Sequence, residues 1–257
     1  MKNSIKSILS LFVAVGFTAC SSDDSTIPNS ANLVLVKKVT ETIHAGDFSE
    51  TSVVEFNYTG NRLTSVQQGA TSTTFAYSGD KPISALRTYG SGEQVSSTFT
   101  YNGDNLVSIV NNSDYSETTD FTYVNNMLAT MSDRYLGSGQ WIQGDSRQLT
   151  FGSGNNLVSE IVDRGTSVYR NDYTFDNQNM PFRNLAVPFR LIYRFEGIDL
   201  LNNNNPLSIT RFSPPTATQP TASSYFEMQY NDQGYPTQIV KYSADGNPIS
   251  TTLIDYL

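Results

Sequence analysis

The most regular feature of the chain is an alternation of apolar and polar positions that returns after about 20 residues and ends in a turn rich in Gly, Asn and Asp. Two aromatic residues, two positions apart, precede each turn, and a segment of the Leu-Val-Ser-Ile type follows it. Side chains two apart on a strand point to one face, and Gly, Asn and Asp supply the positive φ of tight hairpins. Each copy therefore predicts a β-hairpin. The copies begin at Phe56, Phe75, Phe99 and Phe121, with weaker copies at Phe151, Tyr173 and Met228.

Successive hairpins without long crossovers predict an all-β fold, an antiparallel up-and-down meander of roughly 14 strands. We expect strands of about 5 to 8 residues, forming one strongly curved sheet or a half-open barrel. A membrane-spanning barrel would need strands of about 9 to 11 residues with an apolar outer face, whereas these strands are rich in Thr, Ser and Asn.

Residues 180–204 interrupt the alternation with two prolines and dense apolar content. Leu191, Ile192, Phe195 and Ile198 are spaced as on a helix, which predicts a short helix before the asparagine run. One interpretation is a plug that packs into the concave side of the sheet through Phe182, Leu185, Phe189, Leu191 and Phe195. The other is a mobile element that gates a ligand pocket, in which an anionic group contacts Arg183, Arg190 and Arg194.

The N-terminus has the features of an export signal. Lys2 and Lys6 precede an apolar run that is too short to span a bilayer, and small residues lead to Cys20. The segment 17–20 resembles the lipobox of bacterial lipoproteins, which implies lipidation of Cys20 and a membrane partner through that lipid. The alternative is an ordinary secreted protein with an unpaired cysteine. We expect a signal peptide at 1–19, a lipidated flexible tether at 20–31 and a single β-meander domain at 32–257.

The residues after Cys20 bear on localisation. Ser21 resembles the residue of lipoproteins sent to the outer membrane, and Ser22-Asp23-Asp24 resembles a short acidic tag for export to the cell surface. The alternatives are a solvated acidic tether and a periplasmic location. We therefore expect a lipid-anchored protein of the outer membrane at the cell surface.

The repeat itself resembles known families. The pattern F-x-Y-x-x-x-G/N-x-L-x-x-I is similar to the YD repeats of Rhs-type proteins, which build β-sheet shells. It is closer to a family of small exported bacterial lipoproteins, a domain of unknown function with a porin-like, strongly curved β-meander. The order of elements in 179–185, 200–209 and 230–237 also resembles that family. The resemblance implies a fold and brings no activity with it.

Composition limits the classes of function. A formal net charge of −8 over 257 residues gives no electrostatic footprint for nucleic acid, so no nucleic-acid partner is expected. His44 is the only histidine and Cys20 the only cysteine, which leaves zinc sites and Ser-His-Asp or Cys-His nucleophiles almost without support. Asp80, Asp104 and Asp232 occupy turn positions, where Asp serves backbone geometry; contact with calcium is the alternative. We expect a monomer without a metal or cofactor.

Two groups of residues remain as candidate sites. Glu160, Asp163 and Asp172 lie on predicted neighbouring strands, and paired carboxylates would permit glycoside hydrolysis. Trp141 lies near Tyr135 and Tyr169 on predicted adjacent hairpins, where aromatic rings would stack on a sugar or apolar ligand; core packing is the alternative. The sequence favours a non-enzymatic binding or interaction module of the cell envelope, for a glycan or another envelope ligand. A glycoside hydrolase-like enzyme and a purely structural envelope protein are the alternatives.

Overall fold

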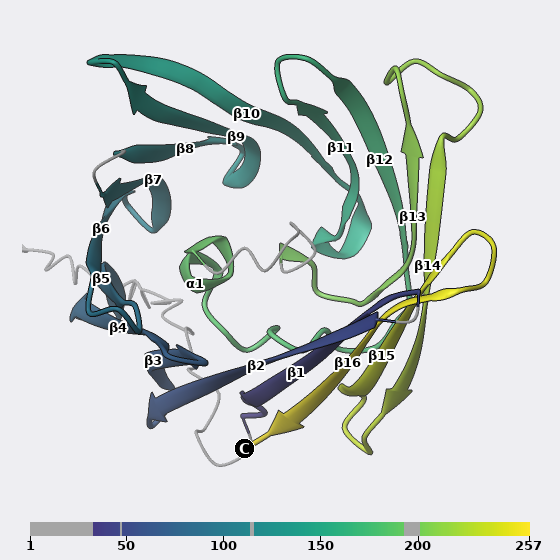
Figure 1. Cartoon of the computed structure of the whole chain (residues 1–257), viewed down its shortest axis with the longest axis horizontal. Helices are drawn as coiled ribbons and strands as arrows, with labels where there is room; N and C mark the ends of the chain where they lie inside the picture. Colours follow the sequence, from purple (N-terminus) through teal and green to yellow (C-terminus); the bar gives the residue numbers. More distant parts are fainter. Residues whose placement is uncertain (1–32, 47, 114–115, 193–200) are drawn as a thin grey trace, which may run out of the picture.

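The computed structural model describes residues 33–46, 48–113, 116–192 and 201–257. Within them the chain forms strands of 7 to 12 residues and one short helix, α1, between β12 and β13 (Figure 1). The strands are β1 Val36–Ala45, β2 Phe48–Thr59, β3 Arg62–Gln68, β4 Thr71–Ser78, β5 Lys81–Thr88, β6 Gln94–Asn102, β7 Asn105–Asn112, β8 Glu117–Val124, β9 Met127–Gly137, β10 Gln140–Phe151, β11 Leu157–Asp163, β12 Val168–Phe175, β13 Pro206–Phe212, β14 Ala222–Tyr230, β15 Pro236–Ser243 and β16 Pro248–Tyr256; α1 is Val187–Ile192 and a 3-10 turn covers Ser153–Asn155.

Each strand pairs antiparallel with its neighbour in sequence, which confirms the meander. The sheet is not half-open, because β1 pairs with β16 and closes a barrel of 16 described strands (Figure 1). The closing register runs from Val36 opposite Tyr256 to Ile43 opposite Ser250. The seven repeat copies supply β2 to β15, so the expected 14 strands omitted only the pair that closes the barrel. Nine of the 16 described strands have 7 or 8 residues, as predicted, and the other seven have 9 to 12, a length that would also suit a membrane-spanning barrel.

The second arm of each hairpin carries a β-bulge that explains its spacing. Leu63 and Val66 are three apart, which on a regular strand would place them on opposite faces. The register shifts between Asn57 and Tyr58, so that one extra residue, Thr64, lies between partners and both apolar side chains face the lumen. The same shift follows in the next copies at 76/77, 100/101, 122/123, 150/151 and 174/175. The L-x-x-I motif thus encodes a bulged strand.

The second aromatic residue of the repeat links neighbouring hairpins. The Tyr101 hydroxyl donates to the Pro82 carbonyl at 2.8 Å, and the Tyr123 hydroxyl donates to the Leu106 carbonyl at 2.8 Å. We call this set the tyrosine ladder; its other members donate from Tyr58 to Val36, from Tyr77 to Leu63 and from Tyr256 to Pro236. Every acceptor is the first or second residue of an odd-numbered strand, and these strands all start at the same end of the barrel, so the ladder lies along that end.

The plug, residues 180–192 and 201–205, lies inside this end of the barrel, where α1 is seen within the ring of strands (Figure 1). Phe189 packs against Phe75 with ring centroids 5.1 Å apart, and Phe182 packs against Phe56 at 5.4 Å. Leu191 joins the core formed by β5 to β12. Pro188 lies in the first turn of α1, where its missing N–H costs nothing. The plug interpretation is confirmed for Phe182, Leu185, Phe189 and Leu191; Phe195 and Ile198 lie outside the described residues.

The asparagine run anchors the plug to the wall. Leu157 N–H donates to Asn202 Oδ1 at 2.6 Å, and the N–H groups of Asn203 and Asn204 both donate to Asn156 Oδ1 at 2.9 and 3.1 Å. Asn205 donates from its N–H and Nδ2 to the Asp176 carboxylate at 3.0 and 2.9 Å. These hydrogen bonds pair polar groups at the end of the barrel, so the asparagine run attaches the plug to the wall.

The outer face of the barrel carries hydroxyl and charged side chains. Hydroxyl pairs bridge neighbouring strands, such as Thr122 with Thr130 at 2.6 Å. Ion pairs join Lys38 to Asp255 at 2.8 Å, Arg134 to Asp120 at 2.5 Å and Arg170 to Asp172 at 3.0 Å. None of the helices among the described residues is long and apolar enough to cross a membrane.

Candidate functional site

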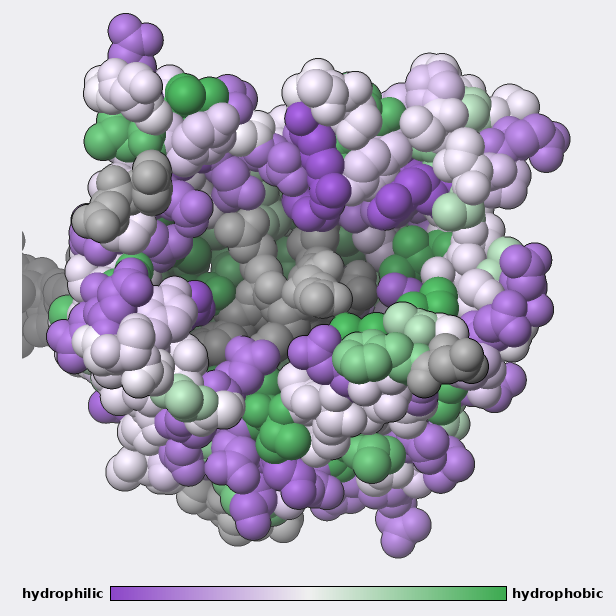
Figure 2. All heavy atoms as spheres, viewed as in Figure 1, coloured by the Kyte–Doolittle hydropathy of each residue, from purple (hydrophilic) through white to green (hydrophobic). Residues whose placement is uncertain are grey.

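The barrel has cavities inside its wall, and Figure 2 shows hydrophilic residues around its rim with hydrophobic residues deeper inside. Its largest described cavity, which we call the main cavity, has a volume of about 610 Å³. That volume is in the range of small-molecule sites. The main cavity lies against the plug and the inner faces of β1, β2 and β14 to β16. Its lining includes Val39, Val54, Met180, Phe182, Phe226, Met228, Ile239 and Ile254, together with Glu41, Glu50 and Lys241.

Apolar and charged residues are separated along the depth of the main cavity. Met180 and Phe182 of the plug form its floor, where Val54 and Ile254 also lie buried. Nearer the opposite end, Glu50 pairs with Ile43, Ile43 with Ser250, and Ser250 with Lys241, so these residues form one row around the wall. A ligand in this cavity would place its apolar part on the plug and its polar part at the open end.

A second, smaller cavity of about 270 Å³, which we call the cationic cavity, lies along β10 to β15. Glu160 is 2% exposed at its base and accepts hydrogen bonds from Arg147 Nη1 at 2.8 Å, Asn171 Nδ2 at 2.7 Å and the Tyr173 hydroxyl at 2.6 Å. Burial disfavours the charged guanidinium of Arg147, but Glu160 outweighs it and the pKa of Arg147 is raised. The carboxylate is fully engaged as an acceptor, which fixes this part of the wall.

Arg211 projects into the cationic cavity from β13. Its Nε donates to Asn171 Oδ1 at 3.1 Å, and its guanidinium carbon lies 4.2 Å from the centre of the Tyr169 ring. Arg164 lies on the same ring at 5.6 Å and pairs with Asp145 at 3.2 Å. Lys241 lines both this cavity and the main cavity. The two cavities therefore meet at a lysine.

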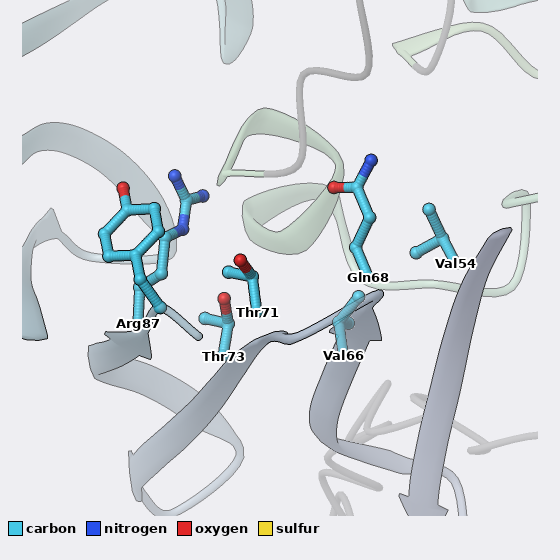
Figure 3. Close-up of a pocket in the computed structure, with 7 residues that line it drawn as sticks. Val54, Val66, Gln68, Thr71, Thr73 and Arg87 are labelled. Atoms are coloured by element: carbon cyan, nitrogen blue, oxygen red, sulfur yellow. The ribbon is translucent and has the colours of Figure 1, made fainter. Parts of the chain in front are cut away.

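A third hollow of about 210 Å³ lies on the opposite wall, against β2 to β5. Figure 3 shows Gln68, Thr71, Thr73 and Arg87 pointing from the inner face of these strands, with Val54 and Val66 beside them. This wall is polar but carries a single cation, so the two sides of the lumen differ in charge.

The three aromatic residues predicted as a binding platform do not lie together. Trp141 pairs with Leu136 on the outer face, where the guanidinium carbon of Arg134 lies 5.5 Å from the centre of its ring. Tyr135 pairs with Ile142 and points to the other face of the same hairpin. Tyr169 is 7% exposed and lines the cationic cavity. Trp141 and Tyr135 are 48% and 43% exposed, and their role in binding stays a prediction.

The three carboxylates considered for hydrolysis are also divided by the sheet. Glu160 faces the lumen, whereas Asp172 pairs with Ser159 on the outer face and Asp163 is three residues from Glu160 on β11. These three residues therefore form no facing pair. No group of three or more His, Cys, Asp or Glu side chains that could hold a metal occurs in the described part of the chain.

The remaining sequence candidates are placed as follows. His44 Nε2 lies 3.0 Å from Thr251 Oγ1 on β16. Arg183 donates to Asn179, and buried Arg190 donates from Nη1 to the Asn202 carbonyl at 3.1 Å. Burial, with Arg183 nearby, lowers the pKa of Arg190 to about 10. Cys20 and Arg194 lie outside the described residues.

Sequence reasoning missed Arg211 and Lys241. Each follows an isoleucine by two positions on its strand, Ile209 and Ile239, so the alternation already placed both on the lumen face. A cation at an inward position of a β-strand was the signal that could have identified them.

Comparisons with known proteins concern the fold. No family model and no curated protein matches the chain. A crystal structure of a porin-like protein from Bacteroides uniformis is similar, with 15% identity and a TM-score of 0.57 over 87% of this chain and 95% of that one. Another porin-like protein, from Bacteroides vulgatus, has 12% identity and a TM-score of 0.49 over 88% of this chain and 99% of that one. The first of these likenesses shows that the chain has the fold of a porin-like β-barrel.

Proposed function

We propose that the protein is a non-enzymatic lipoprotein of the cell envelope whose barrel lumen binds a small amphipathic ligand. The observation that carries this proposal is the main cavity of about 610 Å³, closed at its base by the plug and charged at its open end. A purely structural barrel would need no cavity, because inward side chains could fill its lumen. A concave site with an apolar floor and few polar groups is the usual form of a ligand site.

The outer face supports a barrel that is surrounded by water. A charged side chain on the lipid face of a membrane barrel costs roughly 2 to 4 kcal/mol at the midplane. Here Asp120, Arg134 and Asp172 lie on the outer face in the middle of the wall, among rows of Thr and Ser. Membrane attachment is therefore assigned to the lipid on Cys20 and not to the strands.

The position of β1 decides at which end of the barrel a tether from Cys20 would be attached. Val34, which precedes β1, accepts a hydrogen bond from Asn184 of the plug at 2.9 Å, so the chain enters the barrel at the plugged end. A tether of residues 20–31 reaches at most about 3.5 Å per residue. An anchor on Cys20 would therefore be connected to the barrel at its plugged end.

The ligand proposal is tested with the neutral fluorophore N-phenyl-1-naphthylamine, added to the full chain carrying Cys20→Ser so that no detergent is needed. Ser52→Trp would fill the main cavity, because Ser52 lines it, and should weaken binding at least tenfold. Thr51→Trp is the matched control, since Thr51 is the neighbouring residue on the outer face. Equal binding by the two variants would contradict a site in the lumen.

The anchor is tested separately. Cys20→Ser should move the protein from the membrane fraction to the soluble fraction, and the wild-type protein should incorporate labelled palmitate while the variant does not. Retention of the variant in membranes washed with high salt would contradict the lipoprotein proposal.

A glycan ligand is the second candidate, and exposed Trp141 is the observation that favours it. Its ring lies on the outer face of the long β9–β10 hairpin, within reach of Arg134. An exposed aromatic face of this kind suits stacking on a sugar ring. This site would act independently of the lumen.

A further inference from the structure

The cationic cavity concentrates positive charge in a protein of formal net charge −8. Its lining includes Glu160 as the only acid among the described residues, against four cations: Arg147, Arg164, Arg211 and Lys241. Arg147 is paired with Glu160 and Arg164 with Asp145. Arg211 and Lys241 have no carboxylate within 4.0 Å in the described part of the chain. The chain has 24 acidic residues, and the one that lines this cavity, Glu160, pairs with Arg147.

Arg211 is held in a fixed orientation. The hydrogen bond from Nε to Asn171 and the contact with the Tyr169 ring restrain the guanidinium, and Asn171 is itself restrained by its bond to Glu160. The terminal amino groups of Arg211 donate no hydrogen bond to described residues. A guanidinium restrained in this way presents a fork of donors that matches a carboxylate or a phosphate.

Lys241 connects this cationic wall to the apolar space of the main cavity. Its neighbours in the main cavity include Phe226, whose ring centre lies 5.9 Å from Nζ, and Ile239 two residues before it. The acids of that cavity lie on β1 and β2: Glu41 is two strands away, in the row of Thr252 and Ile239, and Glu50 is three strands away in the row of Lys241, roughly 14 Å along the wall at the usual strand spacing. In the described part of the chain neither carboxylate forms an ion pair with Lys241.

From this arrangement, and resting on the proposed function of the lumen, we infer that the ligand is an anionic amphiphile. Its carboxylate or phosphate head lies in the cationic cavity, which Lys241 and Arg211 both line, and its apolar tail occupies the main cavity down to Met180 and Phe182. The plug supplies the surface for the tail, and the wall of β13 to β15 supplies the selectivity for the head.

The experiment compares four ligands with the same ten-carbon tail, each below its micellar concentration: decanoate, decyl phosphate, decanol and decyltrimethylammonium. Binding to the full chain carrying Cys20→Ser is measured by calorimetry and by displacement of N-phenyl-1-naphthylamine. We expect at least one of the two anions to bind about tenfold more tightly than decanol, as one charge-assisted hydrogen bond provides, and the cation to bind most weakly. The ratio of decanoate to decyl phosphate identifies the preferred head.

Variants locate the head group. Lys241→Met and Arg211→Met should each reduce anion affinity about five- to tenfold and leave decanol binding within twofold. Lys241→Glu should reverse the preference toward decyltrimethylammonium. Lys38→Met, on the outer face, and Arg87→Met, on the opposite wall of the lumen, are the controls and should leave all four affinities unchanged.

The outcomes separate this inference from the proposed function. If decanol and the fluorophore bind but the anions gain nothing, or if Lys241→Met and Arg211→Met have no effect, the anionic head is overturned and the lumen site stands. If Arg87→Met weakens the anions as strongly as Lys241→Met, the charge of the whole lumen is responsible and the assigned site is wrong. If none of the ligands binds, the lumen proposal itself fails.

Discussion

The two ends of the barrel are built from the same strands and differ in what their side chains do. At the plugged end, the ladder tyrosines donate to strand carbonyls, the asparagine run hydrogen-bonds to the wall, and the rings of the plug are buried. At the open end, Lys241, Arg211 and Arg87 face the lumen without an ion partner among the described residues. One end uses its polar groups internally, and the other leaves them for solvent or a ligand.

This difference separates the end of the barrel that stabilises the fold from the end that is available for binding. The turns of the repeat, such as those at Gly60, Gly79 and Gly103, lie at the plugged end, and their positive φ is a requirement of the hairpin. The connections at the open end do not follow the repeat. Substitutions at the plugged end should therefore change the free energy of unfolding, and substitutions at the open end should change binding.

The largest effect is expected inside the plug. Phe189→Ala removes a buried ring that packs against Phe75 and Tyr77, and should lower the free energy of unfolding by about 3 to 5 kcal/mol. Val187→Ala, at a 47% exposed position of the same helix, should cost less than about 1 kcal/mol. Urea unfolding followed by tyrosine fluorescence measures both. Similar losses in the two variants would show that the plug does not stabilise this end.

The second-largest effect on the free energy of unfolding is expected from alkaline pH, because it deprotonates several tyrosines of the tyrosine ladder together. Burial raises the pKa of Tyr77, Tyr101 and Tyr123 to about 12, and burial also raises the pKa of Tyr58 and Tyr256. An unfolded tyrosine titrates near pH 10. From about pH 10 to 12 the unfolded chain therefore releases protons that the folded chain retains, and stability falls as pH rises.

This prediction is checked by measuring the free energy of unfolding between pH 8 and pH 12. The contribution of the tyrosine ladder to the free energy of unfolding should be constant below about pH 9.5 and should fall above that pH. The triple variant Tyr77→Phe, Tyr101→Phe, Tyr123→Phe should show a shallower fall over the same interval, although it starts from lower stability. An unchanged slope would mean that the ladder is not the titrating element.

Removal of one hydrogen bond of the tyrosine ladder should have a smaller effect on the free energy of unfolding. Tyr101→Phe keeps the ring and removes only the hydrogen bond to the Pro82 carbonyl, so the expected cost is about 1 kcal/mol. Tyr135→Phe, at an exposed position toward the open end, should be neutral within about 0.5 kcal/mol. If both substitutions lower the free energy of unfolding equally, only the ring of the repeated tyrosine contributes to stability and its hydroxyl does not.

The sequence predicted the part of this fold that is local. The hairpin, its turn and the inward aromatic pair all follow from the Phe56 copy and its successors, and the meander follows from their order. Closure could not be predicted in this way, because it depends on pairing between Val36–Ala45 and Pro248–Tyr256, which lie at opposite ends of the chain. No local pattern specifies whether a curved meander ends as a half-barrel or meets itself.

The candidate site was predicted less well, because it depends on which face each residue occupies. Trp141 and Tyr135 are six residues apart across a turn, and the register that places them on opposite faces is set by the hairpin loop at Ser138 and Gly139. Glu160 was recognised as a candidate, but its engagement with Arg147, Asn171 and Tyr173 depends on three strands. Arg211 and Lys241 gained significance only when the cavities brought them together.

The smallest effect on stability is expected at Trp141, which makes it the cleanest test of the glycan site. Trp141→Ala removes a half-exposed ring from the outer face and should change the free energy of unfolding by less than about 0.5 kcal/mol. If the ring stacks on sugars, the variant should lose retention on a glycan array that retains the wild-type protein. Ile142→Ala, the neighbouring residue on the other face, is the matched control. Equal retention by wild type and Trp141→Ala would remove the second candidate function and leave the lumen as the only proposed site.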